Sequence, residues 1–294
     1  MEVTTTMRIL LATDGSEEAR TATMWLAACS LPADTALRVV TAVDVPPSAL
    51  DVPPVREFQQ ALRDEARTTA ETARAHLASR FPRAEVRVPE GDARDEILRE
   101  AEAWPADLIV LGARVLGRLA GFVMGSVSLG VVRHALCPVL VVKGHPAPLH
   151  TVLIALDGSQ HATMAAEFTA GLLGSGTKVR LLGVVDTPNY PPSAPPALVA
   201  RLRVGLDRII DERRMALEPA LARVAATFVA RGMGVESRVV VGRPADEIVR
   251  AAAGVDLVVV GARGLGPFRR LMLGSVSEAV LRHADRPVLV VRRG

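Results

Sequence analysis

The chain repeats its own sequence once, in the same order, from one end to the other. The segment RILLATDGSEEA, residues 8–19, returns as TVLIALDGSQHA, residues 151–162. Further on, LRVVTAVDVP returns as VRLLGVVDTP, GDARDEIL as GRPADEIV, and GFVMGSVSLGVVRHALCPVLVV as RRLMLGSVSEAVLRHADRPVLVV. A repeat of this length predicts two copies of one domain. We expect them at 1–146 and 147–294, joined through the sequence GHPAP at 144–148, because proline and glycine favour a linker.

Each half alternates short apolar runs with longer segments of helical pattern. Residues 55–80, for example, carry charge on most of their surface and Ala and Leu on one stripe, as a surface helix does. Strands alternating with helices predict an α/β fold with a parallel sheet of about five strands in each half, covered on both faces. We expect strands at 7–13, 36–43, 84–88, 107–111 and 138–142, and again at 151–156, 178–185, 235–241, 256–260 and 287–292.

Composition argues against several other classes of protein. The apolar run 119–132 ends at Arg118 and Arg133 and is shorter than the about 20 residues that a membrane span needs. The start, MEVTTTMRIL, lacks the basic and apolar regions of a signal peptide, so we expect a cytoplasmic protein. Cys29 and Cys137 form no CxxC pair and are expected to be reduced and buried, without a metal.

The charge pattern does not predict a nucleic-acid partner. The formal net charge is only +3, and acidic residues are scattered among the arginines. Aromatic residues make up 3% of the chain, which is few for a protein that stacks on bases.

A glycine and serine motif follows the fourth expected strand of the second half. Gly261, Gly264 and Gly274 are spaced as G-x-x-G-x9-G, and Ser275 follows the last glycine. Glycines allow close approach and a positive φ, and a helix that begins here offers free N–H groups. Ser275 and Ser277 add hydroxyl donors, so the motif predicts a phosphate site at the carboxyl ends of the strands.

With an aspartate at the end of the first strand, and with the closing H-A-x-x-P-V-L-V-V, these motifs resemble the universal stress protein family. The resemblance covers essentially the whole chain, twice. It implies two tandem Rossmann-like domains of the adenine nucleotide alpha hydrolase type, each with a five-stranded, mostly parallel sheet flanked by helices. It also implies bound ATP, with Mg²⁺ held through the phosphates.

The same resemblance assigns nucleotide contacts. Asp157 would meet the base and ribose, the backbone near Val184 the adenine, and the glycine motif the phosphates. The implied set in the second half is Ala155, Asp157, Val184, Gly261, Ala262, Arg263, Gly264, Gly274, Ser275, Val276 and Ser277. The implied set in the first half is Ala12, Asp14, Ala42, Gly112, Ala113, Arg114, Val115, Gly125, Ser126, Val127 and Ser128.

The first half departs from the motif at Val115, which stands where the second half has Gly264. A β-branched residue disfavours positive φ and adds bulk near a ligand. Gly117 follows and could relieve the turn. Whether the first half binds nucleotide therefore stays open.

Several of these residues also have a purely structural interpretation. Asp14 and Asp157 precede Gly-Ser, which is typical of an Asx turn ahead of a helix N-cap. Arg114 and Arg263 are either solvated surface charges or phosphate contacts.

Other repeated residues are expected to serve the helices. His134 and His283 should pack at helix C-termini, where the helix dipole favours them. The acidic pairs at 95–96 and 246–247 are expected at helix starts rather than in a catalytic dyad.

The chain has no G-x-x-x-x-G-K-[ST] motif and no evident catalytic base. We therefore expect an ATP-binding regulator of the stress response that hydrolyses ATP slowly at most. Two alternatives stay open: a slow ATPase whose turnover resets the switch, and an interaction module whose motif is vestigial or binds another adenine nucleotide such as cyclic AMP.

The halves should pack as an internal pseudo-dimer. The apolar strands at 139–142 and 288–291 are candidate edges for a homodimer.

Overall fold

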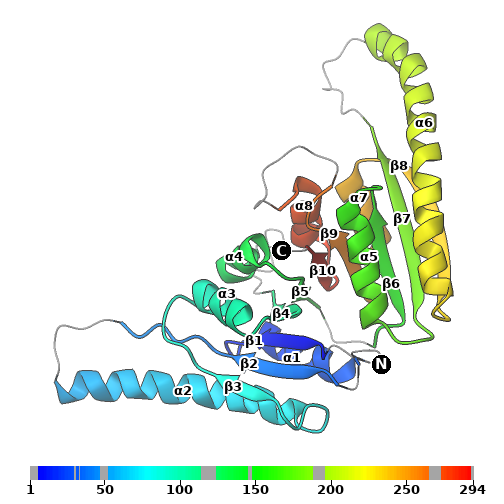
Figure 1. Cartoon of the computed structure of the whole chain (residues 1–294). Helices are drawn as coiled ribbons and strands as arrows, with labels where there is room; N and C mark the ends of the chain where they lie inside the picture. Colours follow the sequence, from blue (N-terminus) through cyan, green and yellow to red (C-terminus); the bar gives the residue numbers. More distant parts are fainter. Residues whose placement is uncertain are drawn as a thin grey trace.

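Figure 1 shows the computed structural model of the chain. It describes residues 6–29, 31–32, 34–46, 52–113, 124–144, 148–187, 196–264 and 273–292.

The two halves build the same succession of elements. The first half contains β1 (Arg8–Ala12), α1 (Glu17–Ala28), β2 (Ala36–Val40), α2 (Pro53–Leu77), β3 (Glu85–Arg87), α3 (Ala93–Ala103), β4 (Leu108–Gly112), α4 (Ser126–His134) and β5 (Val139–Val142). The second contains β6 (Thr151–Leu156), α5 (Gln160–Leu172), β7 (Lys178–Asp186), α6 (Pro196–Val229), β8 (Gly234–Gly242), α7 (Pro244–Ala251), β9 (Leu257–Gly261), α8 (Ser275–His283) and β10 (Val288–Val291).

The expected strands are confirmed, and only one of their boundaries is wrong by more than one residue. The strand expected at 36–43 ends at Val40, because its partner β3 is only three residues long. Pro89 follows β3 where the second half has Val240, and proline has no N–H to continue a strand ladder. Beyond the short strands, only Val43 and Glu90 form an isolated bridge among the described residues. In the second half, β7 and β8 pair over their whole length.

All ten strands of the described chain form one sheet, in the order β3-β2-β1-β4-β5-β10-β9-β6-β7-β8. Within each half the strands are parallel, which confirms the expected α/β architecture. The two halves meet where β5 and β10 pair antiparallel, with Leu140 opposite Leu289. The long helices α2 and α6 therefore lie at opposite ends of the molecule (Figure 1).

This pairing corrects the expectation of a homodimer through the terminal strands. The edges of β5 and β10 satisfy each other's backbone hydrogen bonds inside one chain, as an internal pseudo-dimer. A strand edge that is already paired cannot accept a strand from a second chain. In this arrangement β5 and β10 are paired on both sides and offer no free edge to a second chain.

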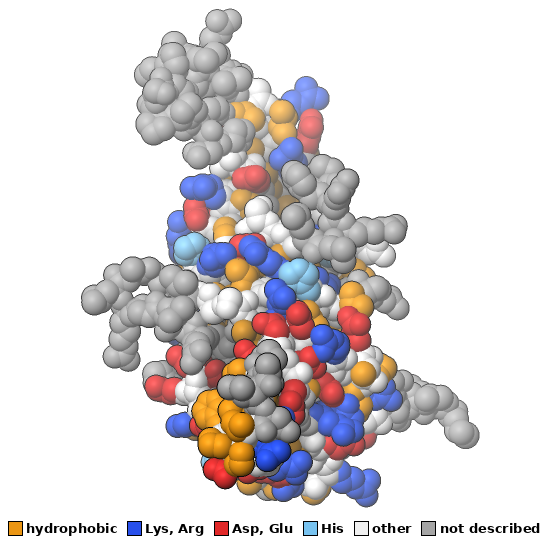
Figure 2. Space-filling view, turned by 90° about the vertical axis from the view of Figure 1, so that its left-hand side faces the viewer, with side chains coloured by type: hydrophobic (Ala, Val, Ile, Leu, Met, Phe, Trp, Pro, Cys, Tyr) orange, Lys and Arg blue, Asp and Glu red, His pale blue; other side chains and the backbone are white. Residues whose placement is uncertain are grey.

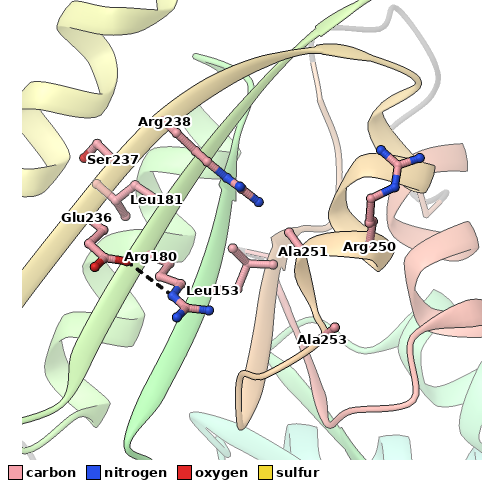
Figure 3. A pocket seen from close by; sticks show the side chains of 9 residues that line it. All are labelled: Leu153, Arg180, Leu181, Glu236, Ser237, Arg238, Arg250, Ala251 and Ala253. Atoms are coloured by element: carbon pink, nitrogen blue, oxygen red, sulfur yellow. Dashed lines mark ion pairs between the residues drawn. The ribbon is translucent and has the colours of Figure 1, made fainter.

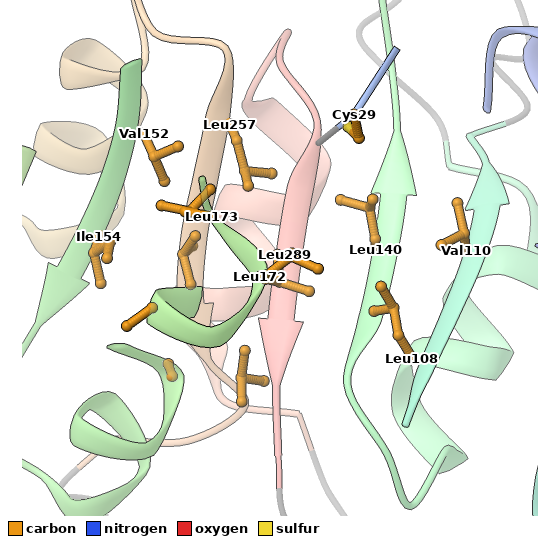
Figure 4. Close-up of a cluster of buried hydrophobic side chains, with 14 of the residues drawn as sticks. Cys29, Leu108, Val110, Leu140, Val152, Ile154, Leu172, Leu173, Leu257 and Leu289 are labelled. Carbon is orange, nitrogen blue, oxygen red and sulfur yellow. The ribbon is translucent and has the colours of Figure 1, made fainter. Parts of the chain in front are cut away.

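Helices cover both faces of the sheet, and a separate apolar core lies under each layer. One core packs α1, α2, α5 and α6 on the sheet and includes Trp25 and Phe228. Leu140 and Leu289 of the same core are labelled in Figure 4. The other core lies beneath α3, α4, α7 and α8 and includes Val141. Both cores run through the junction of the halves, so burying them stabilises the two halves together.

Charged side chains of both signs intermingle on the face in Figure 2, and the described residues of that face form no continuous basic stripe. None of the described helices is both long and apolar enough to cross a bilayer.

In each half, a cation that follows the last strand binds the end of the last helix of the other half. Lys143, just beyond β5, is buried, and its Nζ donates to the carbonyls of Leu281 and Ala284 at the end of α8, the latter at 3.0 Å. Arg292, just beyond β10, occupies the matching place. It donates to the carbonyls of Val132 (2.8 Å), Arg133 (2.9 Å) and Ala135 (3.0 Å) at the end of α4. Each cation satisfies carbonyls that a helix end leaves unpaired.

The cap made by Lys143 predicts a pH-dependent stability. Burial lowers the pKa of Lys143 from 10.5 to about 8 in the folded chain. The unfolded chain therefore holds more protons between pH 8 and 10.5, so this residue makes the unfolding free energy rise with pH in that window. Urea unfolding at pH 7.5 and pH 10 should show wild type gaining roughly 1–3 kcal/mol relative to Lys143→Met. A parallel pH profile for the two proteins would contradict this.

Candidate functional site

The Asp-Gly-Ser sequence after the first strand of each half makes a turn into the next helix. Asp157 Oδ1 accepts a hydrogen bond from the Ser159 N–H at 2.9 Å, and Gly158 has a φ of +79°. Ser159 Oγ then accepts from the Ala162 N–H at 3.2 Å and caps α5. The first half repeats the turn with Asp14, Gly15, Ser16 and Ala19. The Asx turn and helix cap are therefore confirmed.

The second oxygen of Asp157 lies against the glycine motif. Strands β6 and β9 are parallel neighbours, so Asp157 and Gly264, which follow their carboxyl ends, lie on the same side of the sheet, the side where the parallel strands end. A Cβ added to Gly264 would fall inside 3.0 Å of Asp157 Oδ2, a distance that real Cβ atoms essentially never show. A side chain at residue 264 would therefore push the Asp157 carboxylate out of this position. At this point the strand order reverses, which is where sheets of this kind bind ligands.

The start of α8 closes the other side of this edge. The Gly274 N–H donates to the carbonyl of Ala262 at 2.8 Å, which joins the two glycine segments. Gly274 is the N-cap of α8, and no side chain caps the helix there. Ser275, the first helical residue, is exposed. The first turn of α8 therefore presents backbone N–H groups that a side chain does not satisfy, together with the positive end of the helix dipole.

The hydroxyls of Ser277 and Ser128 have a different role from the expected one. Ser277 Oγ is buried and donates to the Gly261 carbonyl at 2.6 Å. Ser128 Oγ donates to the Gly112 carbonyl at 3.0 Å. Each hydroxyl has one proton, and here that proton ties a helix to a strand. A phosphate would have to compete with the Gly261 carbonyl for this proton, and the expectation that Ser277 donates to a phosphate stays a prediction.

The motif glycines are also explained by packing rather than by backbone conformation. None of Gly261, Gly264 and Gly274 has a positive φ. A Cβ on Gly261 would lie 3.1 Å from the backbone carbon of His161, and one on Gly112 would lie 2.7 Å from the Ala19 nitrogen. These glycines let α5 and α1 approach β9 and β4. Gly264, the counterpart of Val115, needs no positive φ, so the second half supports the argument from bulk and not the argument from φ.

The structure brings most of the expected second-half residues to one edge. Gly183 pairs with Leu156, so Val184 follows it beside Asp157. Ala155, Arg263 and Val276 are half-buried. Burial and the positive charge of Arg263 lower the pKa of Arg292, which places positive charge beside the motif.

In the first half, Asp14 is exposed and Ala42 lies beyond the end of β2. The matching strand ends and helix start contain Ala12, Gly112, Ala113, Gly125, Ser126, Val127 and Ser128. Arg114, Val115 and Gly117 lie outside the described residues.

His134 and His283 lie in the last turns of α4 and α8, as expected, but both are exposed, so the expectation that they pack there is wrong. His134 Nδ1 lies 2.8 Å from the Gly130 carbonyl within the last turn of α4. Glu96 pairs with Arg99, and Glu247 pairs with Arg250 at 2.5 Å, each within its own helix. These carboxylates stabilise helices and form no dyad.

The two cysteines are free thiols. Burial raises the pKa of Cys29 to about 12 and that of Cys137 to about 11, so both thiols stay protonated at neutral pH. Cys29 is buried as expected, and Cys137 is half-buried. Among the described residues no group of three or more His, Cys, Asp or Glu side chains could hold a metal ion.

The packing role of Gly112 gives a matched test of stability. Gly112→Ala should lower the unfolding free energy by about 1–3 kcal/mol, because the methyl group would press on the backbone of α1. Gly171 lies in α5 with nothing within 4 Å of an added Cβ. Gly171→Ala should instead stabilise by about 0.5–1 kcal/mol. Chemical denaturation compares the two, and equal effects would show that contact with α1 is not the cause.

The repeated βαβ units and the sheet order define a tandem Rossmann-like α/β protein. The sequence model of the universal stress protein family matches residues 5–143 and again residues 148–292. The chain belongs to this family.

Relatives and solved structures agree with this assignment. The chain is 36% identical over 202 residues to universal stress protein Rv2005c of Mycobacterium tuberculosis and 32% identical over 197 residues to Rv2623 of the same organism. Each match covers 64% of this chain and 62% of the relative, so it spans less than two thirds of the relatives' length. The crystal structure of a universal stress protein from Archaeoglobus fulgidus shares the fold, with a TM-score of 0.63 and 24% identity over 98% of both chains.

Proposed function

We propose that the second half binds ATP, with Mg²⁺ held through the phosphates, at the carboxyl ends of β6 and β9. Occupancy of this site would change the conformation or partner binding of a stress-response regulator. The observation that carries the proposal is the contact between the Asp157 carboxylate and Gly264 at the reversal of strand order.

The residues at this edge suit the parts of a nucleotide. Asp157 uses Oδ1 in its turn, which leaves Oδ2 to accept hydrogen bonds from ribose hydroxyls. The N–H groups at the start of α8 and the positive end of its dipole suit phosphate oxygens. Arg263 adds a positive charge at the same edge.

The same residues do not suit rapid hydrolysis. Lys143 and Lys178 are the only lysines in the chain. Lys143 contacts the end of α8, and Lys178 pairs with Glu236 at 2.5 Å. Neither takes the role of the lysine that neutralises the transferred phosphate in P-loop enzymes. The proposal is therefore a binding protein with slow turnover at most.

The number of nucleotides per chain tests the site. The purified protein is denatured, and the small molecules released are counted by mass spectrometry against protein. Gly264→Val introduces the residue that the first half has at this position, and its Cβ would displace the Asp157 carboxylate. We expect ATP in wild type and at least one nucleotide fewer per chain in Gly264→Val.

The reciprocal variant Val115→Gly shows whether that residue limits the first half. Two nucleotides per wild-type chain would show that Val115 is tolerated. Cyclic AMP in place of ATP would change the ligand, and no adenine nucleotide together with no thermal shift on adding Mg-ATP would overturn the proposal.

Asp157→Asn separates the ligand role of this residue from its role in the turn. The asparagine oxygen can still accept from the Ser159 N–H, so the unfolding free energy without nucleotide should change by less than about 0.5 kcal/mol. Loss of the carboxylate should weaken Mg-ATP binding at least tenfold, because hydrogen bonds to a charged acceptor are the stronger ones. Calorimetric titration measures the affinity. Asp14→Asn is the matched control in the first half, and equal losses from both variants would contradict a site centred on Asp157.

A further inference from the structure

A cavity of about 490 Å³ lies in the second half, on the side of the sheet covered by α7. Arg180, Glu236 and Arg238 line it from β7 and β8, and Ala251 and Ala253 line it from the end of α7 and the turn beyond (Figure 3). Arg180 and Glu236 lie in the first part of their strands, towards the amino ends. None of the residues proposed to bind nucleotide lines this cavity.

The first half fills the equivalent place with its own side chains. Arg38 and Glu85 pair across β2 and β3 in the same register that Arg180 and Glu236 have across β7 and β8. Arg38 also lies 3.4 Å from Glu100 of α3, and its guanidinium carbon lies 4.5 Å from the centre of the Trp104 ring. Only 10% of the Arg38 side chain is exposed. A carboxylate and an indole therefore enclose this arginine.

The second half lacks both of these side chains. Ala251 follows Arg250 in α7 where Glu100 follows Arg99 in α3. The four residues 102–105, which include Trp104, correspond to only two residues in the second half, Ala253 and Gly254. Asp107 and Asp256 then resume the match, because both donate backbone N–H groups to the start of the first strand of their half. The Arg180 side chain is consequently 38% exposed.

The residues in and beside the cavity also carry more positive charge than their counterparts in the first half. Lys178 stands where the first half has Ala36. Glu236 is shared between Lys178 at 2.5 Å and Arg180 at 3.4 Å. Arg238 has no ion-pair partner among the residues that the structure describes. The second half thus has no carboxylate in the place of Glu100 to balance these positive charges. An anion bound in the cavity is therefore favoured.

We propose that this cavity binds a small aromatic carboxylate. Its ring takes the place that Trp104 has in the first half and stacks on the Arg180 guanidinium. Its carboxylate takes the place of Glu100, between Arg180 and Arg238. A volume of about 490 Å³ lies in the usual range of small-molecule sites.

Calorimetric titration of the full chain with indole-3-acetate tests this proposal. We expect saturable binding of one molecule per chain, at least tenfold weaker binding of indole and of acetate, and no change when Mg-ATP is present. The double variant Ala251→Glu with Ala253→Trp would fill the cavity as the first half does and should abolish binding. The proposal of an aromatic carboxylate ligand would be overturned if wild type did not bind indole-3-acetate, or if it bound inorganic phosphate equally tightly.

Two single variants test the ligand site even if the double variant does not fold. Arg238 and Arg87 hold the same register position in β8 and β3. Arg238→Ala should weaken binding of indole-3-acetate at least tenfold, whereas Arg87→Ala should leave it unchanged. Equal affinities for both variants and wild type would place the ligand elsewhere and refute the site.

Discussion

The antiparallel pairing of β5 with β10 is the contact on which the rest of the molecule depends. It turns two five-stranded sheets into one and carries both apolar cores through the junction. It also sets the ends of α4 and α8 where Arg292 and Lys143 can reach across from the other half. Without this pairing the terminal strands would expose apolar edges, and both cations would lose the carbonyls that they satisfy.

Features that depend on local sequence were predictable. The strands follow from short runs rich in Val, Ile and Leu, and the turn at Asp157 follows from Asp-Gly-Ser chemistry within three residues. The partner of β5 was not predictable, because the VLVV strands fit a second chain as well as each other. The packing that favours glycine at positions 112 and 264 was also not predictable from the sequence. It depends on Glu18, Ala19 and Asp157, which are distant in sequence.

The cavity beside Arg180 illustrates a different limit. Motif searches find residues that are present, whereas this cavity results from the absence of a carboxylate and an indole. Comparison of the two halves could have shown that the second half lacks one carboxylate, since Glu100 aligns with Ala251. Only the structure shows that Glu100 and Trp104 enclose Arg38, which lies more than 60 residues earlier in the chain.

The covalent link between the halves has a consequence for how such a protein can diverge. In a symmetric dimer of separate chains every substitution occurs twice, once in each subunit. Here Val115 can differ from Gly264, and Ala251 from Glu100, without a matching change across the junction. The link also makes the pairing of β5 and β10 independent of protein concentration, because the second half is always present at a high effective concentration. Such a chain can keep an asymmetric pair of halves intact at a copy number at which separate subunits would dissociate.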